Sequence, residues 1–156
     1  MALKLYIAYG TAADQVVALR LQALAAVNGL SVYVPPAYTR RVDAIDLEAE
    51  SHAKLIDSDV VFGVVTTGIS DACRQELDTA QICSIERIIL ADPTPAFQLR
   101  ACFPDNIIMI DPANPAMAEQ EIVQVLERTK MEKASRTAMI ALGTLALGLM
   151  LFAPQD

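Results

Sequence analysis

One acidic residue stands where a charged side chain is difficult to accommodate. The residue pattern predicts a helix over Ser70–Ile82. At a period of 3.6 residues its polar side should face water and carries Arg74, Asp78 and Gln81. Glu76 falls on the opposite side, among the small residues Ala72, Cys73, Thr79, Ala80 and Cys83. A carboxylate facing the interior must find a partner, reach a cavity or change its pKa, because burying it bare is costly. Two interpretations stay open: a structural carboxylate paired with an arginine, or a catalytic carboxylate beside a pocket.

Other site chemistries have little support in the residue types. The chain has one histidine, His52, which we expect to be partly buried and satisfied. The three cysteines, Cys73, Cys83 and Cys102, contain no CxxC pair and are interpreted as small core residues. We therefore predict no zinc site or other metal site and no disulfide framework. The chain also lacks a paired-carboxylate motif and a Ser/His/Asp set.

Short apolar runs alternate with helical patterns over residues 1–128. Runs typical of buried strands are Leu3–Tyr9, Ser31–Val34, Val60–Thr66, Arg87–Ala91 and Asn106–Ile110. Helical patterns cover Ala12–Asn28, Asp46–Ile56, Ser70–Ile82 and Pro115–Lys133. Five apolar strands separated by helices predict an α/β fold with a flavodoxin-like, doubly wound, five-stranded parallel sheet.

Ligands of such sheets bind beyond the carboxyl ends of the strands. The segments there are predicted as loops: Gly10–Asp14, Pro35–Arg41, Thr66–Asp71 and Asp92–Leu99. The candidate substrate-binding residues are Tyr9, Gly10 and Thr11 at the end of the first strand, Tyr38, Arg40 and Arg41 after the second, and Ser70 before the helix of Glu76. An arginine in the second loop could hold a diphosphate, although loop arginines are more often solvated. Ser70 could equally cap its helix, and the first group could form an ordinary turn.

Composition narrows the functional classes. The 156 residues allow one domain plus an appendage, and 54% hydrophobic with 20% charged residues excludes a disordered chain. The net charge of −7 argues against nucleic acid as a partner, because phosphate neutralisation needs clustered Lys and Arg. No secretory signal pattern opens the sequence, so we expect the main domain in a reducing cytosol.

The C-terminal segment Thr137–Ala153 carries no charge. Its length as a helix is about 26 Å, at the short end of what spans a bilayer. Basic residues precede it: Arg128, Lys130, Lys133 and Arg136. This pattern predicts a domain at 1–128, a basic juxtamembrane segment at 129–136 and a transmembrane helix at 137–153, with the N-terminal domain on the cytoplasmic side of the cell membrane. The alternative is a buried C-terminal core helix.

Three segments together resemble a bacterial TIR (Toll/interleukin-1 receptor) domain. LKLYIAYGTAAD, which begins at Leu3, is similar to the first strand and loop of the family. AESHAKLIDSDVVFGVVTTGIS, from Ala49, resembles the helix that ends in Ile-x-x-Ser-Asp before a valine-rich strand. SDACRQELDTA, from Ser70, resembles the C-x-x-E-L segment of the next helix.

The resemblance implies that Glu76 is the catalytic residue of an enzyme that cleaves the nicotinamide–ribose bond of NAD⁺. NAD⁺ is then a substrate, and no cofactor is expected. Nicotinamide leaves as a neutral molecule, so the reaction needs no general acid. It needs a carboxylate that supports the oxocarbenium-like ribosyl group in a sheltered site. The family also implies a homo-oligomer and a role in bacterial antiphage defence.

Two other functions remain open on the same residues. A nucleoside 2-deoxyribosyltransferase-like hydrolase would also use a glutamate beside a ribosyl carbon. A non-enzymatic TIR-like sensor or effector would instead act through its transmembrane helix. Hydrolysis and cyclisation of NAD⁺ are not distinguished by the sequence.

Overall fold

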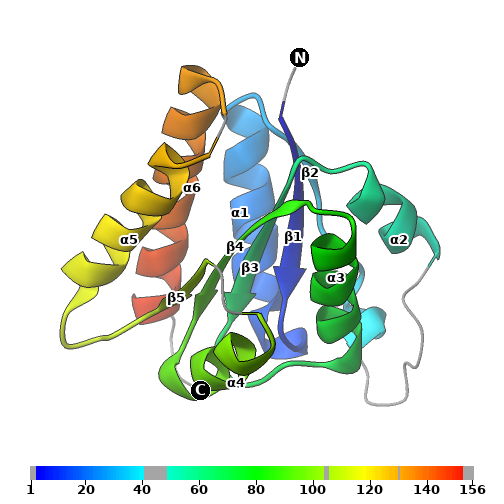
Figure 1. Cartoon of the computed structure of the whole chain (residues 1–156), viewed down its shortest axis with the longest axis horizontal. Helices are drawn as coiled ribbons and strands as arrows, with labels where there is room; N and C mark the ends of the chain where they lie inside the picture. The colour runs from blue at the N-terminus through cyan, green and yellow to red at the C-terminus, as the bar shows by residue number, and fades with distance from the viewer. Residues whose placement is uncertain (1–2, 41–48, 104–105, 130, 153–156) are drawn as a thin grey trace.

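Five parallel strands form the centre of the fold (Figure 1). The structure is a computed structural model that describes residues 3–40, 49–103, 106–129 and 131–152. The strands are β1 (Lys4–Tyr9), β2 (Ser31–Tyr33), β3 (Val60–Val65), β4 (Glu86–Ala91) and β5 (Ile107–Met109). Their order is β2-β1-β3-β4-β5, and every neighbouring pair is parallel. The predicted flavodoxin-like doubly wound sheet is confirmed.

Helices cover both faces of the sheet (Figure 1). One face carries α1 (Gln15–Val27), α5 (Pro115–Glu127) and α6 (Lys133–Phe152). The other carries α2 (Ala49–Ile56), α3 (Asp71–Ile82) and α4 (Pro93–Cys102). The short 3-10 helices η1 (Ala12–Asp14) and η2 (Ala37–Arg40) follow β1 and β2. All six residues of β3 are buried, as expected for a central strand covered on two sides.

Alternation along the strands divides the core into two clusters. Leu5 and Ile7 of β1 pack toward α1 and α6, whereas Tyr6 and Ala8 pack toward α2 and α3. The side chain of Tyr6 therefore reaches the face on which α3 carries Glu76.

The prediction of a loop over Asp92–Leu99 is wrong, since most of this segment belongs to helix α4. Pro93 and Pro95 favour a loop when read in isolation. Both lie in the first turn of α4, where the backbone N–H groups have no helical acceptor and proline is tolerated. A second difference concerns the helix predicted over Pro115–Lys133, which ends at Glu127.

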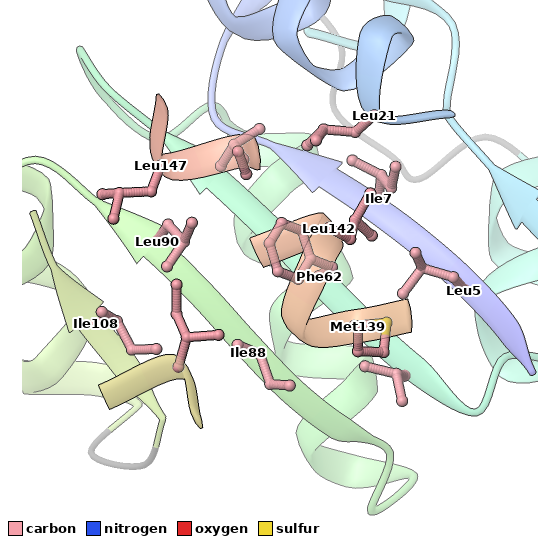
Figure 2. Packing of buried hydrophobic residues seen from close by; sticks show 14 of the residues in the cluster. Leu5, Ile7, Leu21, Phe62, Ile88, Leu90, Ile108, Met139, Leu142 and Leu147 are labelled. Atoms are coloured by element: carbon pink, nitrogen blue, oxygen red, sulfur yellow. The ribbon is translucent and has the colours of Figure 1, made fainter. Parts of the chain in front are cut away.

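The C-terminal helix α6 is long and apolar enough to cross a membrane, and it begins at Lys133 rather than Thr137. In this structure it lies between α1 and α5 and contacts both (Figure 1). Figure 2 shows Met139, Leu142 and Leu147 packed over side chains of the sheet, among them Phe62 and Leu90. One face of α6 is thus packed against the sheet, as the alternative interpretation of a C-terminal core helix predicts.

Arg136 connects α6 to the preceding turn. Its Nη2 donates hydrogen bonds to the carbonyl oxygens of Thr129 at 3.3 Å and Met131 at 3.1 Å. In this arrangement, part of the predicted juxtamembrane segment forms the tight connection between α5 and α6.

Candidate functional site

Helix α3 places Glu76 against the sheet. Ser70 caps the helix, because its Oγ accepts a hydrogen bond from the backbone N–H of Cys73 at 3.2 Å. The residues Arg74, Asp78 and Gln81 are exposed, whereas Ala72, Cys73, Glu76, Leu77 and Ala80 are buried. Glu76 itself has 0% exposure. The prediction that Glu76 lies on the buried face is confirmed.

The Glu76 carboxylate is bound by Arg40 and Tyr6. Arg40 approaches both carboxylate oxygens, with Nη1 3.1 Å from Oε2 and Nη2 donating to Oε1. The hydroxyl of Tyr6 also donates to Oε2. The side chains of Arg40 and Glu76 both have 0% exposure, so the described structure holds the pair closed to solvent. This is the bidentate geometry in which an arginine best compensates a buried carboxylate.

Arg40 is held at the carboxyl end of β1 by further contacts. Its Nε donates to the backbone oxygen of Tyr9 at 3.0 Å, and its Nη1 donates to Thr39 Oγ1 at 2.8 Å. The guanidinium carbon lies 4.1 Å from the centroid of the Tyr9 ring. The Tyr9 hydroxyl in turn donates to the carbonyl of Pro35 at 2.6 Å. These contacts fix η2 against the end of β1.

Burial dominates the electrostatics of this cluster. Desolvation raises the pKa of Glu76, and the charge and hydrogen bonds of Arg40 and the hydrogen bond of Tyr6 oppose that rise. Desolvation also raises the pKa of Tyr6, and the neighbouring Glu76 raises it further. Burial raises the pKa of the Cys73 thiol, one turn before Glu76, to about 12. In this structure Arg40 and Tyr6 together occupy both oxygens of the Glu76 carboxylate.

The turn after β1 is tied to the loop that precedes α3. The backbone N–H of Ser70 donates to the carbonyl of Gly10 at 2.8 Å. A Cβ on Gly10 would lie 2.1 Å from the carbonyl oxygen of Gly68, so this approach requires glycine. Thr11 Oγ1 lies 3.3 Å from Thr67 Oγ1. These residues position α3 and thereby Glu76.

Asp14, the last residue of the TIR-like segment LKLYIAYGTAAD, strengthens the same connection, although it was not among the candidate site residues. It is 2% exposed, and its carboxylate accepts hydrogen bonds from the backbone N–H of Thr66, at 3.2 Å, and from the Thr66 hydroxyl. Desolvation raises the pKa of Asp14, and the bonds from Thr66 oppose this. An acidic residue in an expected loop gave no sign of burial.

The structure brings three of the predicted site residues into one cluster. Tyr9, Arg40 and Glu76 meet, and Tyr6 and Thr39 join them although the sequence pattern did not indicate either. Gly10, Thr11 and Ser70 belong to the neighbouring connection. Tyr38 is 53% exposed, and Arg41 lies outside the described residues.

Three minor expectations are wrong. His52 is exposed rather than partly buried, because α2 turns Ser51 and Leu55 toward the core instead. Cys83 and Cys102 are exposed, since they stand at the ends of α3 and α4 where the helices leave the sheet.

A cavity of about 810 Å³ lies at the opposite end of the sheet from the carboxyl ends of the strands. Lys4, Val60 and Glu86, at the beginnings of β1, β3 and β4, line it, and Glu76 does not. Within residues 3–40, 49–103, 106–129 and 131–152, no group of three or more His, Cys, Asp or Glu side chains could hold a metal ion. No protein-family model matches the chain, and a comparison with curated proteins also gives no match.

Proposed function

We propose that this chain cleaves the nicotinamide–ribose bond of NAD⁺, by hydrolysis or cyclisation, with Glu76 as the catalytic carboxylate. The observation that carries the proposal is a fully buried glutamate in a C-x-x-E-L segment, held by an arginine beside the carboxyl end of β1. Parallel sheets of this kind bind ligands at that end. Once exposed, the carboxylate would contact the ribose hydroxyls and support the positive charge that develops as nicotinamide leaves.

The Arg40–Glu76 pair supports the proposal through its energetics. A buried ion pair is seldom more stable than well-packed apolar side chains of the same volume. A charged pair at a ligand-binding edge is therefore a functional candidate, as strongly perturbed carboxylates in such positions often are. Arg40 is the last residue of the four-residue η2, so a shift of this short segment would free Glu76. The released guanidinium could then bind the diphosphate of NAD⁺.

We further propose that α6 attaches the protein to the cell membrane, with the sheet domain on the cytoplasmic side. The support is the length and apolar character of α6. The resemblance to TIR domains suggests that copies self-associate and that the reaction serves antiphage defence.

Nicotinamide release from NAD⁺ by the full chain tests the catalytic proposal. Chromatography would follow nicotinamide and the ribosyl products, which distinguish hydrolysis from cyclisation. We expect Glu76→Gln to lower the rate by about 10²-fold or more, because it removes the charge that the developing cation needs. Asp78→Asn, on the exposed side of the same helix, is the matched control and should retain the rate. Equal rates for wild type and Glu76→Gln would contradict the proposal.

A non-enzymatic effector is the second candidate, and the closed pair favours it. Glu76 has 0% exposure and Arg40 and Tyr6 satisfy its carboxylate, as in a purely structural cluster. In that case Glu76→Gln would leave any effect of the expressed chain on cell growth intact, whereas substitutions in Thr137–Ala153 would abolish that effect. Release of a base from deoxynucleosides instead of NAD⁺ would indicate a deoxyribosyltransferase-like hydrolase.

A further inference from the structure

Helices α1 and α6 together expose an apolar surface. On α1, Val16 is 59% and Val27 84% exposed, and Leu19 lies between them on the same side. On α6, Ala141, Thr144 and Leu145 are exposed. We name these six residues the α1–α6 strip. The outer face of a surface helix in a soluble protein normally carries charged residues, and the outer face of α6 beyond Arg136 carries none.

A groove runs between the two helices beside the strip. It has a volume of about 570 Å³, and Leu24 of α1 lines it together with five residues of α6: Ala141, Thr144, Leu145, Gly148 and Leu149. A Cβ on Gly148 would meet no atom within 4 Å, so the groove is open at that point. Exposed apolar surface that crosses two elements in this way marks an interaction site.

The charges of the two helices indicate the chemistry of the partner. Neither α1 nor α6 contains Asp or Glu, although the chain has 19 acidic residues. Their charged residues are all basic: Arg20, Lys133 and Arg136. Arg20 is exposed one residue after Leu19, where its stem can follow the apolar surface while its guanidinium reaches outward. Arg136 is held by the carbonyls of Thr129 and Met131, which leaves Arg20 and Lys133 as the exposed cations. A second copy would bring these like charges together, whereas lipid phosphates would pair with them.

We propose that the α1–α6 strip lies on the surface of a bilayer that contains anionic lipids, while α6 remains packed in the fold. This specifies the membrane attachment proposed above and does not depend on NAD⁺ cleavage. A helix with an apolar face and basic polar residues binds in the interfacial plane, with its apolar side chains inserted among the acyl chains.

The packing of α6 explains why the surface arrangement fits the described fold. Crossing the membrane would take Met139, Leu142, Ala146 and Leu147 out of the core. The sheet side chains beneath them in Figure 2, including Phe62 and Leu90, would lose their cover. Lying on the membrane removes none of these contacts.

Co-sedimentation of the full chain with vesicles tests the proposal. We expect the chain to sediment with phosphatidylcholine vesicles containing phosphatidylglycerol and less with phosphatidylcholine alone. Val16→Glu/Val27→Glu should weaken this binding at least tenfold. The matched control is Ile82→Glu/Phe97→Glu on α3 and α4, whose side chains are 82% and 64% exposed on the opposite face of the sheet. This control should bind like wild type, and circular dichroism would verify that both variants fold.

A cross-link distinguishes surface binding from insertion of α6. A Cβ at Gly143 would lie 2.9 Å from Ile122 Cγ2, so cysteines at these two positions are close enough to form a disulfide between α5 and α6. The variant Ile122→Cys/Gly143→Cys would also carry Cys83→Ser and Cys102→Ser, which remove the two exposed native thiols. Its oxidised form should bind vesicles as well as its reduced form does.

Three results would overturn the proposal. Loss of vesicle binding on oxidation, restored by reductant, would mean that α6 leaves the sheet to insert. Absence of binding to either vesicle would exclude a lipid partner. A wild-type dimer that Val16→Glu/Val27→Glu separates, without vesicle binding, would assign the strip to a second copy. None of these outcomes depends on the rate of nicotinamide release, so the membrane proposal and the catalytic proposal can fail separately.

Discussion

At the scale of single residues, Arg40 and Glu76 depend on each other for burial. Each is a charge with no exposed side-chain surface, and Tyr6, Thr39 and the backbone of Tyr9 supply the remaining hydrogen bonds. Removing one partner would leave the other charge unpaired in a region of low dielectric constant. The same property makes the pair sensitive to any ligand or subunit that moves Arg40.

We therefore expect Arg40→Met to lower the free energy of unfolding by about 3–5 kcal/mol, measured by urea denaturation at pH 7. Arg40→Met/Glu76→Leu should recover most of that loss, because the unpaired carboxylate is gone. Lys4→Met is the control, since Lys4 and Asp57 form an exposed ion pair whose loss should change little. A loss in the double variant as large as in Arg40→Met would mean that the carboxylate is not the cause.

The pH dependence of Arg40→Met follows from the direction of the pKa shift of Glu76. Burial raises the pKa of Glu76 above its ordinary value of 4.5, so the folded chain binds this proton more tightly than the unfolded chain. The stability that the group contributes is present below pH 4.5 and is lost as pH rises above it. Without Arg40 that loss should be larger than in wild type, and urea titrations at several pH values would show it.

The buried side of Glu76 was predictable, but its partner was not. One helical period within α3 sets which side of the helix a residue occupies. The partner Arg40 is distant in the sequence, and its position depends on how β2 and η2 end beside β1. The role of Tyr6 was not predictable for a related reason. A tyrosine within an apolar strand is interpreted as a core residue, and the strand pattern does not indicate which group its hydroxyl will contact.

At the scale of elements, α4 and α6 show where patterns mislead. Prolines at the start of α4 look like loop residues unless the first helical turn is recognised. The apolar sequence of α6 suits a bilayer and equally suits the slot between α1 and α5, since hydropathy alone does not specify which apolar surroundings a helix enters. The strand pattern was more reliable, because continuous apolar runs between helices leave few alternatives to a parallel sheet.

The two glycines of α6 test whether the helix is packed in the fold. Alanine in place of a helical glycine stabilises by about 0.5–1 kcal/mol where the methyl group has room, and Gly148 has open space for it. Gly143 does not, since its Cβ would lie 2.9 Å from Ile122 Cγ2. We expect Gly148→Ala to raise the free energy of unfolding. The free energy of unfolding of Gly143→Ala should lie at least about 1 kcal/mol below that of Gly148→Ala, because the added methyl group overpacks the contact with Ile122. Equal effects of the two substitutions in urea denaturation would indicate that α6 does not pack against α5.

At the scale of the whole molecule, the sheet separates the two proposed sites. Tyr6 and Glu76 lie on the face covered by α2, α3 and α4, whereas the α1–α6 strip belongs to the helices on the other face (Figure 1). A surface held against a membrane through α1 and α6 would leave the carboxyl end of β1 and η2 accessible to a soluble substrate. Binding to vesicles and cleavage of NAD⁺ should consequently respond to different substitutions.

Truncation after Glu132 tests whether α6 completes the domain or is only an appendage. Residues 1–132 lack the helix that covers Phe62, Ile88 and Leu90, so the sheet would expose a large apolar area between α1 and α5. Because burial of such area is the dominant stabilising contribution in folding, we expect this chain to bind a hydrophobic dye and to lose its cooperative thermal transition. A chain ending at Phe152 retains α6 and is the control, with a midpoint close to that of the full protein. If residues 1–132 instead unfold cooperatively at the same midpoint, α6 contributes nothing to the sheet domain and is free to act as a membrane span.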